Sequence, residues 1–224
     1  MCPFQYSHAS VGGAVACDGC YLATLHDNFH DNAASTKLPA VETSWGSGGA
    51  VACSSGGELR LRHSSFTDNT AERRGGAVAV EQCSAVVDTT RMVANAVDFV
   101  SAHAAANPGA AVTLATVRSH EVGGGAVYVE HDVINGRTRG QRVSIKRSVI
   151  GGNTAVLGGG FYAVSDADNS TCTSAPWMCA QGRVNGTLAL TSVTWTNDGE
   201  PNVAGKNGTD VYEGAGEWRR LHQR

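Results

Sequence analysis

The sequence lacks several features that mark common classes of protein. Its formal net charge is only −3, with acidic and basic residues interspersed, so it carries no basic patch for nucleic acid or an anionic membrane. Its apolar runs fall far short of the roughly 18 residues that a membrane-spanning helix requires. Aromatic residues make up only 6% of the chain. We therefore expect no nucleic-acid partner and no membrane-spanning segment, and the small apolar residues favour narrow stacked coils over one wide core.

A double glycine recurs along the chain, and each copy begins a short alternating segment. Clear copies occupy residues 12–17, 48–53, 75–80, 124–129 and 158–163, with a degenerate copy at 208–212. Two and four residues after the second glycine the side chain is mostly apolar, which predicts a short strand with those positions inward. The second glycines are expected where the chain turns sharply and a β-carbon has little room. They are Gly13, Gly49, Gly76, Gly125 and Gly159.

A second landmark alternates with the glycine pairs. It is an apolar residue followed three positions later by Asn, Ser or Asp, and it begins at Phe4, Phe29, Phe66, Met92, Ile150 and Trp195. In most copies two apolar residues stand seven and five positions earlier, which predicts a second strand. We expect Phe29 and Phe66 to stack on adjacent coils. The Asn side chains tolerate left-handed backbone and are expected to form a hydrogen-bonded ladder. The ladder residues are Asn32, Asn69, Asn95 and Asn153.

The spacing of these landmarks predicts a solenoid. Intervals of 25 and 26 residues define the bare coil, and the intervals of 37, 58 and 45 residues must release their excess as loops. The longest interval also leaves room for a degenerate extra coil near residues 109–114. We predict one all-β domain, a right-handed parallel β-helix of the pectin-lyase-like class with six or seven coils over residues 4–212 and a tail at 213–224. Because repeat-like sequence begins at once, we expect a fragment or subdomain.

The combined pattern of Phe-x-x-Asn and Gly-Gly-Ala-Val resembles the repeat of the chlamydial polymorphic outer membrane proteins. Gly-Gly-Ala-Val-Tyr at residues 124–128 and Gly-Gly-Gly-Phe-Tyr at 158–162 fit that repeat closely. The resemblance covers roughly residues 4–212, and the large loops of this chain depart from it. It implies a parallel β-helix in a secreted or surface-exposed stalk that acts in adhesion.

The seven cysteines leave at least one without a partner in the chain. Cys17 and Cys53 share an inward column of adjacent coils, where a disulfide fits the ladder spacing and two stacked free thiols fit equally well. Cys17 and Cys20 also form a Cys-x-x-Cys pair, but no second pair at metal-ligand spacing accompanies it. Cys172 and Cys179 are candidates for a disulfide within one loop.

Other candidate sites lie on the surface. Sequons at Asn169, Asn185 and Asn207 permit glycosylation in a secreted protein. Tyr128 and Tyr162 share an outward column and are expected to offer a small aromatic binding surface for a sugar or a protein.

Candidate carboxylates are few and dispersed. Asp31 and Asp68 precede equivalent Asn residues and are expected to stack at the surface, where we interpret them as solvated turn residues. The one acidic loop cluster is Asp166, Asp168 and Asn169, whose composition would suit weak calcium binding. We expect no catalytic residue, no cofactor and no metal site.

These observations favour a non-catalytic scaffold for adhesion or recognition, extracellular or at a cell surface, with a glycan or a cell-surface protein as partner. The alternative is a carbohydrate-active enzyme of the same fold, either a polysaccharide lyase or a glycoside hydrolase. Such an enzyme needs carboxylates and a basic residue that converge in a groove on one sheet face. A truncated fragment with no independent role is the third interpretation.

Overall fold

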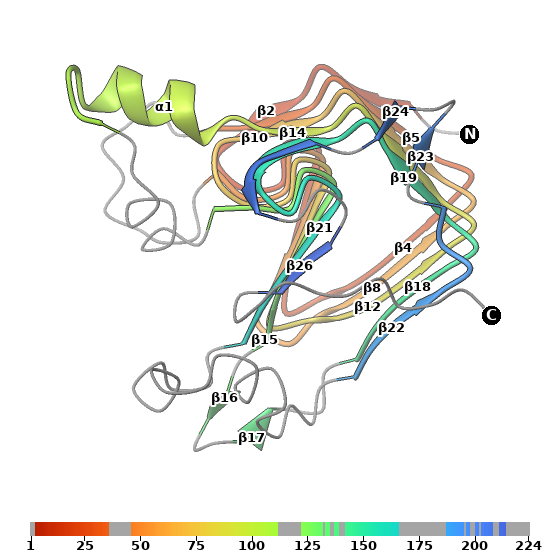
Figure 1. Ribbon diagram of the computed structural model, residues 1–224. Helices are drawn as coiled ribbons and strands as arrows, with labels where there is room; N and C mark the ends of the chain where they lie inside the picture. Colours follow the sequence, from red (N-terminus) through yellow and green to blue (C-terminus); the bar gives the residue numbers. More distant parts are fainter. Residues whose placement is uncertain are drawn as a thin grey trace.

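The structure is a computed structural model that describes residues 3–35, 46–111, 122–131, 133–134, 137–138, 142–165, 187–194, 196–197, 200–201, 203–207 and 211–213. In these residues the chain is mostly β-strand. It visits four parallel sheets in a fixed order and then returns to the first, one strand further along each sheet (Figure 1). We call each such passage a layer, and the stacked sheets are consistent with a solenoid-like fold.

The first sheet contains β1 (Pro3–Gln5), β5 (Asn28–His30), β9 (Ser65–Thr67), β13 (Arg91–Val93) and β19 (Val149–Gly151). The second contains β2 (His8–Ala9), β6 (Ala33–Ala34), β10 (Thr70–Ala71), β14 (Ala96–Val97), β20 (Thr154–Leu157) and β25 (Val203–Asn207). The third contains β3 (Val15–Asp18), β7 (Val51–Ser54), β11 (Val78–Glu81), β15 (Val127–His131), β21 (Phe161–Ser165) and β26 (Val211–Glu213). The fourth contains β4 (Tyr21–Leu25), β8 (Glu58–Arg62), β12 (Ser84–Asp88), β18 (Arg142–Lys146) and β22 (Thr187–Thr191).

Equivalent residues of successive layers lie directly over one another. Phe4, Phe29 and Phe66 are register partners in turn, and their rings stack with centroids 4.7 and 4.5 Å apart. Met92 and Ile150 continue the same file. The main hydrophobic core is built from such files, because strand alternation points every second side chain of each sheet inward.

Two of the four corners are two residues long wherever both flanking strands are described. At the corner between the first and second sheets, the 1–2 corner, the first residue has a positive φ. These residues are Tyr6, Asp31, Asp68, Ala94 and Gly152. The corner between the fourth and first sheets, the 4–1 corner, repeats this arrangement. Its positive-φ residues are His26, His63, Thr89, Arg147 and Ser192.

The glycine pair precedes the third sheet, at the 2–3 corner, and its two members are needed for different reasons. The first glycine has a positive φ, for example +66° at Gly48, where a β-carbon would meet its own chain at Val51 O. A β-carbon on the second glycine, Gly49, would lie 2.0 Å from Gly76 O of the next layer and 2.7 Å from Thr70 O. Gly13, Gly76 and Gly125 make the same contact, and Gly159 supplies the carbonyl that Gly125 faces.

The long intervals in the sequence are insertions and add no layer. β13 pairs directly with β19, and β11 pairs directly with β15, so the described residues form six layers with no extra coil near residues 109–114. The segment before β15 instead contains a helix, α1 (Phe99–Ala106), which departs from the all-β expectation. After β15, the insertion contains the antiparallel pair β16 (Val133–Ile134) and β17 (Arg137–Thr138), and a second such pair joins β23 (Thr196–Asn197) to β24 (Glu200–Pro201). Within the described residues, no helix has the length and apolar character to cross a membrane.

Candidate functional site

The Asn residues of the 1–2 corner form a continuous buried ladder. Asn32 Nδ2 donates to Asn69 Oδ1 at 2.9 Å, Asn69 Nδ2 to Asn95 Oδ1 at 2.9 Å, and Asn95 Nδ2 to Asn153 Oδ1 at 2.9 Å. Each Oδ1 also accepts the backbone N–H of the Asn in the preceding layer, at 2.9–3.1 Å. At the amino-terminal end, Ser7 N–H donates to Asn32 Oδ1. The ladder residues are at most 1% exposed, so they hold the layers in register and are not available to a ligand.

A second ladder, of hydroxyl groups, lies inside the 4–1 corner and was not predicted. Thr24 Oγ1 and Ser64 Oγ are 3.2 Å apart, and Ser148 Oγ accepts the Thr90 N–H at 3.1 Å. Ser148 Oγ in turn donates to Lys146 O at 2.7 Å. The signal was present two residues before the landmarks Phe66, Met92 and Ile150, where Ser64, Thr90 and Ser148 occupy one column of the sequence.

Tyr128 and Tyr162 are buried, so the prediction that they form an exposed binding surface is wrong. The two residues are register partners as expected, with ring centroids 5.6 Å apart, but they are only 0% and 4% exposed. They belong to a second hydrophobic cluster, outside the main core, that includes Phe99 of α1 and Leu157 of β20. Arg74, 5% exposed, lies 5.1 Å from the Tyr128 ring centroid. The tyrosines are therefore core residues of this second cluster.

The cysteine pairing also differs from the expected one. Cys17 and Cys53 are register partners, but Cys17 bonds to Cys20 and Cys53 bonds to Cys83. In-register neighbours of a parallel sheet keep their β-carbons near the strand spacing of about 4.8 Å, which exceeds the roughly 3.5–4.5 Å that a disulfide prefers. Both observed disulfides join the next-to-last residue of a third-sheet strand to the residue before a fourth-sheet strand.

Several predicted sites fall outside the described residues. They are the sequons at Asn169 and Asn185, the acidic cluster at Asp166 and Asp168, and the cysteines Cys172 and Cys179. Asn207, the third sequon residue, is the last residue of β25.

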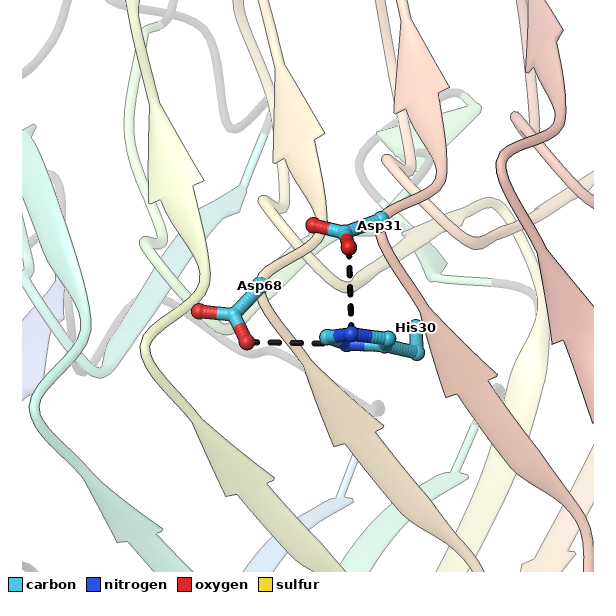
Figure 2. A group of neighbouring side chains, drawn as sticks. All are labelled: His30, Asp31 and Asp68. Carbon is cyan, nitrogen blue, oxygen red and sulfur yellow. Dashed lines mark ion pairs between the residues drawn. The ribbon is translucent and has the colours of Figure 1, made fainter.

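One surface cluster brings together three residues that can each ligate a metal ion. His30 ends β5, Asp31 follows it in the 1–2 corner, and Asp68 occupies the equivalent corner position of the next layer (Figure 2). His30 Nε2 lies 3.0 Å from Asp31 Oδ2, and His30 Nδ1 lies 3.5 Å from Asp68 Oδ2. One ligand atom can be chosen from each residue so that all lie within 4.8 Å of one another. We call these three residues the His30 cluster.

The repeat itself places the His30 cluster. Phe29 points inward to the aromatic file, so alternation points the next residue, His30, outward. Positive φ at Asp31 and Asp68 turns the chain after each strand, and their backbone N–H groups donate to Thr67 O and Val93 O of the following layers. The stacked pair Asp31 and Asp68 was expected, but the histidine beside it was missed, because the position before the corner is Gln, His, Thr, Val or Gly in the five layers and shows no repeat.

No family model, curated protein or solved structure matches this chain.

A shallow groove outside the 4–1 corner is the second surface feature. It is lined in part by Asp27, His63, Arg91 and Arg147. Among its described lining residues it has one carboxylate, Asp27, whereas glycoside hydrolysis uses a pair on opposite sides of the bond. The ring of His63, which lines the groove, stacks on that of His26 with centroids 5.0 Å apart. Eight of the groove's nine described lining residues are polar or charged.

Proposed function

We propose that the chain is a right-handed parallel β-helix that works as a non-catalytic recognition scaffold, secreted or at a cell surface. The observation that supports this most is the distribution of insertions. Long segments interrupt the layers at the 2–3 corner and at the corner between the third and fourth sheets, the 3–4 corner, whereas the other two corners are two residues long wherever both flanking strands are described. A rigid stack thus carries segments of variable length before and after its third-sheet strands.

The remainder of the fold suits such a role. The ladders and stacked rings couple each layer to the next, so the positions from which insertions leave are fixed relative to one another. Two described insertions flank the same strand, since α1 precedes β15 and the β16–β17 hairpin follows it (Figure 1). Binding residues placed on loops over a rigid scaffold are a common arrangement for recognition. The right hand of the coil follows from the strong preference of parallel β-crossover connections.

The resemblance to the polymorphic outer membrane protein repeat supports an adhesive role and an extracellular setting. Under this proposal the partner is a glycan or a cell-surface protein, and the insertions make the contact. The alternative function, a carbohydrate-active enzyme, differs in that the protein must cleave a polysaccharide and not merely bind it.

Loop trimming tests the proposal. Residues 131–141 are replaced by Gln-Ser, which matches the two-residue connection at Gln82 and Cys83 with Ser in place of the cysteine. Wild type and the trimmed variant are compared on glycan arrays and on intact cells, with Arg147→Gln on a short corner as the matched control. Recognition predicts weaker binding for the trimmed variant alone. Release of reducing ends or unsaturated sugars from a polysaccharide panel by the wild type would overturn the proposal in favour of the enzyme.

A further inference from the structure

We propose that the His30 cluster binds a divalent transition-metal ion of the zinc class. This inference goes beyond the scaffold role and does not depend on it. An imidazole between two carboxylates sets this cluster apart from ordinary acidic turn residues, because nitrogen donors are preferred by Zn²⁺, Ni²⁺ and Cu²⁺, whereas Ca²⁺ and Mg²⁺ prefer oxygen donors alone.

The distances suit one small ion. Zinc bonds to nitrogen and carboxylate oxygen are about 2.0–2.2 Å, so two ligands of one tetrahedral ion lie about 3.3 Å apart. His30 Nε2 and Asp31 Oδ2, at 3.0 Å, already meet this spacing. Asp68, whose side chain is 51% exposed, has the freedom to rotate its carboxylate toward the same point. In Figure 2, Asp31 and Asp68 approach the imidazole from two adjacent layers.

The imidazole is also oriented by groups outside the cluster. His30 Nδ1 lies 3.3 Å from Thr67 O and 3.2 Å from Thr67 Oγ1. In the tautomer whose Nδ1–H donates to that carbonyl, Nε2 keeps a lone pair and faces Asp31. Metal-binding histidines characteristically donate their second ring N–H to a backbone carbonyl or carboxylate, which fixes the ring and its tautomer. Thr67 belongs to the next layer, so the stacking of layers preorganises the ligand.

The proposed site is open to solvent. The side chains of His30 and Asp31 are 32% and 39% exposed, and three protein ligands leave a tetrahedral ion one position for water or an outside donor. The site therefore suits an exchangeable ion that a carboxylate or imidazole of another molecule can also ligate. It does not resemble a closed structural zinc site with four protein ligands.

Calorimetric titration of the full chain with ZnCl₂ tests the proposal. We expect His30→Gln and Asp68→Asn each to lower the association constant for Zn²⁺ at least tenfold. His63→Gln is the matched control, since His63 is also a surface histidine but stands at the 4–1 corner, and it should leave that constant unchanged. CaCl₂ titrated into wild type should give at least tenfold weaker binding than ZnCl₂.

Histidine-selective NMR identifies the site among the other histidines of the chain. On addition of Zn²⁺ the His30 ring nitrogens should shift first, and circular dichroism confirms that each variant keeps its strand signal. Equal Zn²⁺ binding by wild type and His30→Gln, or a first shift at another histidine, would overturn the proposal. A failed metal site would leave the loop-trimming experiment unaffected, so the two proposals fail separately.

Discussion

The 1–2 and 4–1 corners differ from the 2–3 and 3–4 corners in what they tolerate. The first two keep a length of two residues wherever both flanking strands are described. The 2–3 corner extends from residues 158–160 in one layer to 98–126 in another, and the 3–4 corner from 19–20 to 166–186. All four join strands of the same stack, so the difference must lie in the bonds that each corner makes.

At a constant-length corner both residues are bonded to neighbouring layers. In the 1–2 corner the Asp68 N–H donates to Val93 O of the next layer, and Asn69 is hydrogen-bonded to Asn32 on one side and Asn95 on the other. An added residue would displace one of these groups and leave buried donors without acceptors. At the 2–3 corner the insertion that contains α1 enters before the glycine pair Gly124–Gly125, so the close backbone packing of the glycines is kept.

The short 3–4 corners are linked by disulfides and not by hydrogen-bond ladders. Cys17–Cys20 closes this corner in the first layer, and Cys53–Cys83 joins the second layer to the third. The layers after them have long connections at this corner, at residues 132–141 and 166–186. A covalent link thus stands at this corner where the connections are short, and ladders stand at the corners whose length is constant.

The largest expected effect comes from lengthening a constant corner. Insertion of Gly-Ser-Gly between Asp68 and Asn69 should abolish the cooperative unfolding transition, because it removes the middle of the Asn ladder. The same insertion between Gly109 and Ala110, after α1, should lower the free energy of unfolding by less than about 1 kcal/mol, since loop-closure entropy grows slowly with length. Urea unfolding followed by circular dichroism measures both. Similar losses at the two positions would contradict the distinction between corners.

Gly49→Ala should have the next largest effect. Its β-carbon would lie 2.0 Å from Gly76 O, and neither backbone can move without shifting a whole layer. We expect a loss of about 4 kcal/mol or more in the free energy of unfolding. Gly56→Ala is the matched control at the 3–4 corner, because Gly56 has a φ of +80° but no atom within 4 Å of the added carbon. It should cost only the backbone strain, about 1–2 kcal/mol. Equal costs would show that packing between layers is not what requires the second glycine.

Asn69→Ala should cost about 3 kcal/mol in the free energy of unfolding. It removes the acceptor of both the Asn32 N–H and Asn32 Nδ2, and it leaves Asn32 N–H buried without that partner. Asn107→Ala is the control in the inserted region, where the exposed Asn107 Nδ2 donates to His103 O at 3.3 Å. That change should cost less than about 1 kcal/mol. Denaturant unfolding of the two variants distinguishes a ladder Asn from a helix-capping one, and comparable losses would argue against the ladder.

The files of Phe, Asn and Gly are readable from the sequence because stacking gives equivalent residues the same surroundings. Phe29 and Phe66 occupy the same environment in adjacent layers, so the same residue type recurs there. Features that occur once have no such repetition. The helix α1 lies in one insertion, and it helps to bury Tyr128, whose outward position in the strand had indicated exposure.

The candidate site shows the same limit. Asp31 and Asp68 were predicted to stack because they recur before the ladder Asn. His30 has no counterpart in the neighbouring layers, and only its outward direction was implied by alternation. The candidate pairing of Cys17 with Cys53 was wrong because it rested on adjacency along a column. Cys83 lies in the corner beyond the third-sheet strand, where no column of the aligned copies contained it.

The smallest effect should come from the outward side of a constant corner. Arg147, 66% exposed at the 4–1 corner, forms an ion pair with Asp88, and its hydrogen bonds hold the pKa of that carboxyl below its ordinary value. Arg147→Gln should lower the free energy of unfolding by less than about 1 kcal/mol at pH 7, since water screens the pair. Gln tolerates the positive φ, as Gln82 shows at φ 60°. Ser148→Ala, on the inward side, should cost more, because it orphans the buried Thr90 N–H.

The pH dependence of the stability costs of Arg147→Gln and Ser148→Ala separates the effect of charge from the effect of a lost backbone hydrogen bond. Because the folded pKa of Asp88 is depressed, the stabilisation is complete above the unfolded pKa of about 3.9 and is lost as pH falls through the lower folded value. The difference between wild type and Arg147→Gln should therefore be constant from pH 7 to pH 5 and disappear in stronger acid. The cost of Ser148→Ala should stay the same from pH 7 into stronger acid, since the serine hydroxyl does not gain or lose a proton there. A cost of Arg147→Gln that persists in acid would mean that the outward residue also serves the backbone, and the constant length of this corner would then depend on both of its residues.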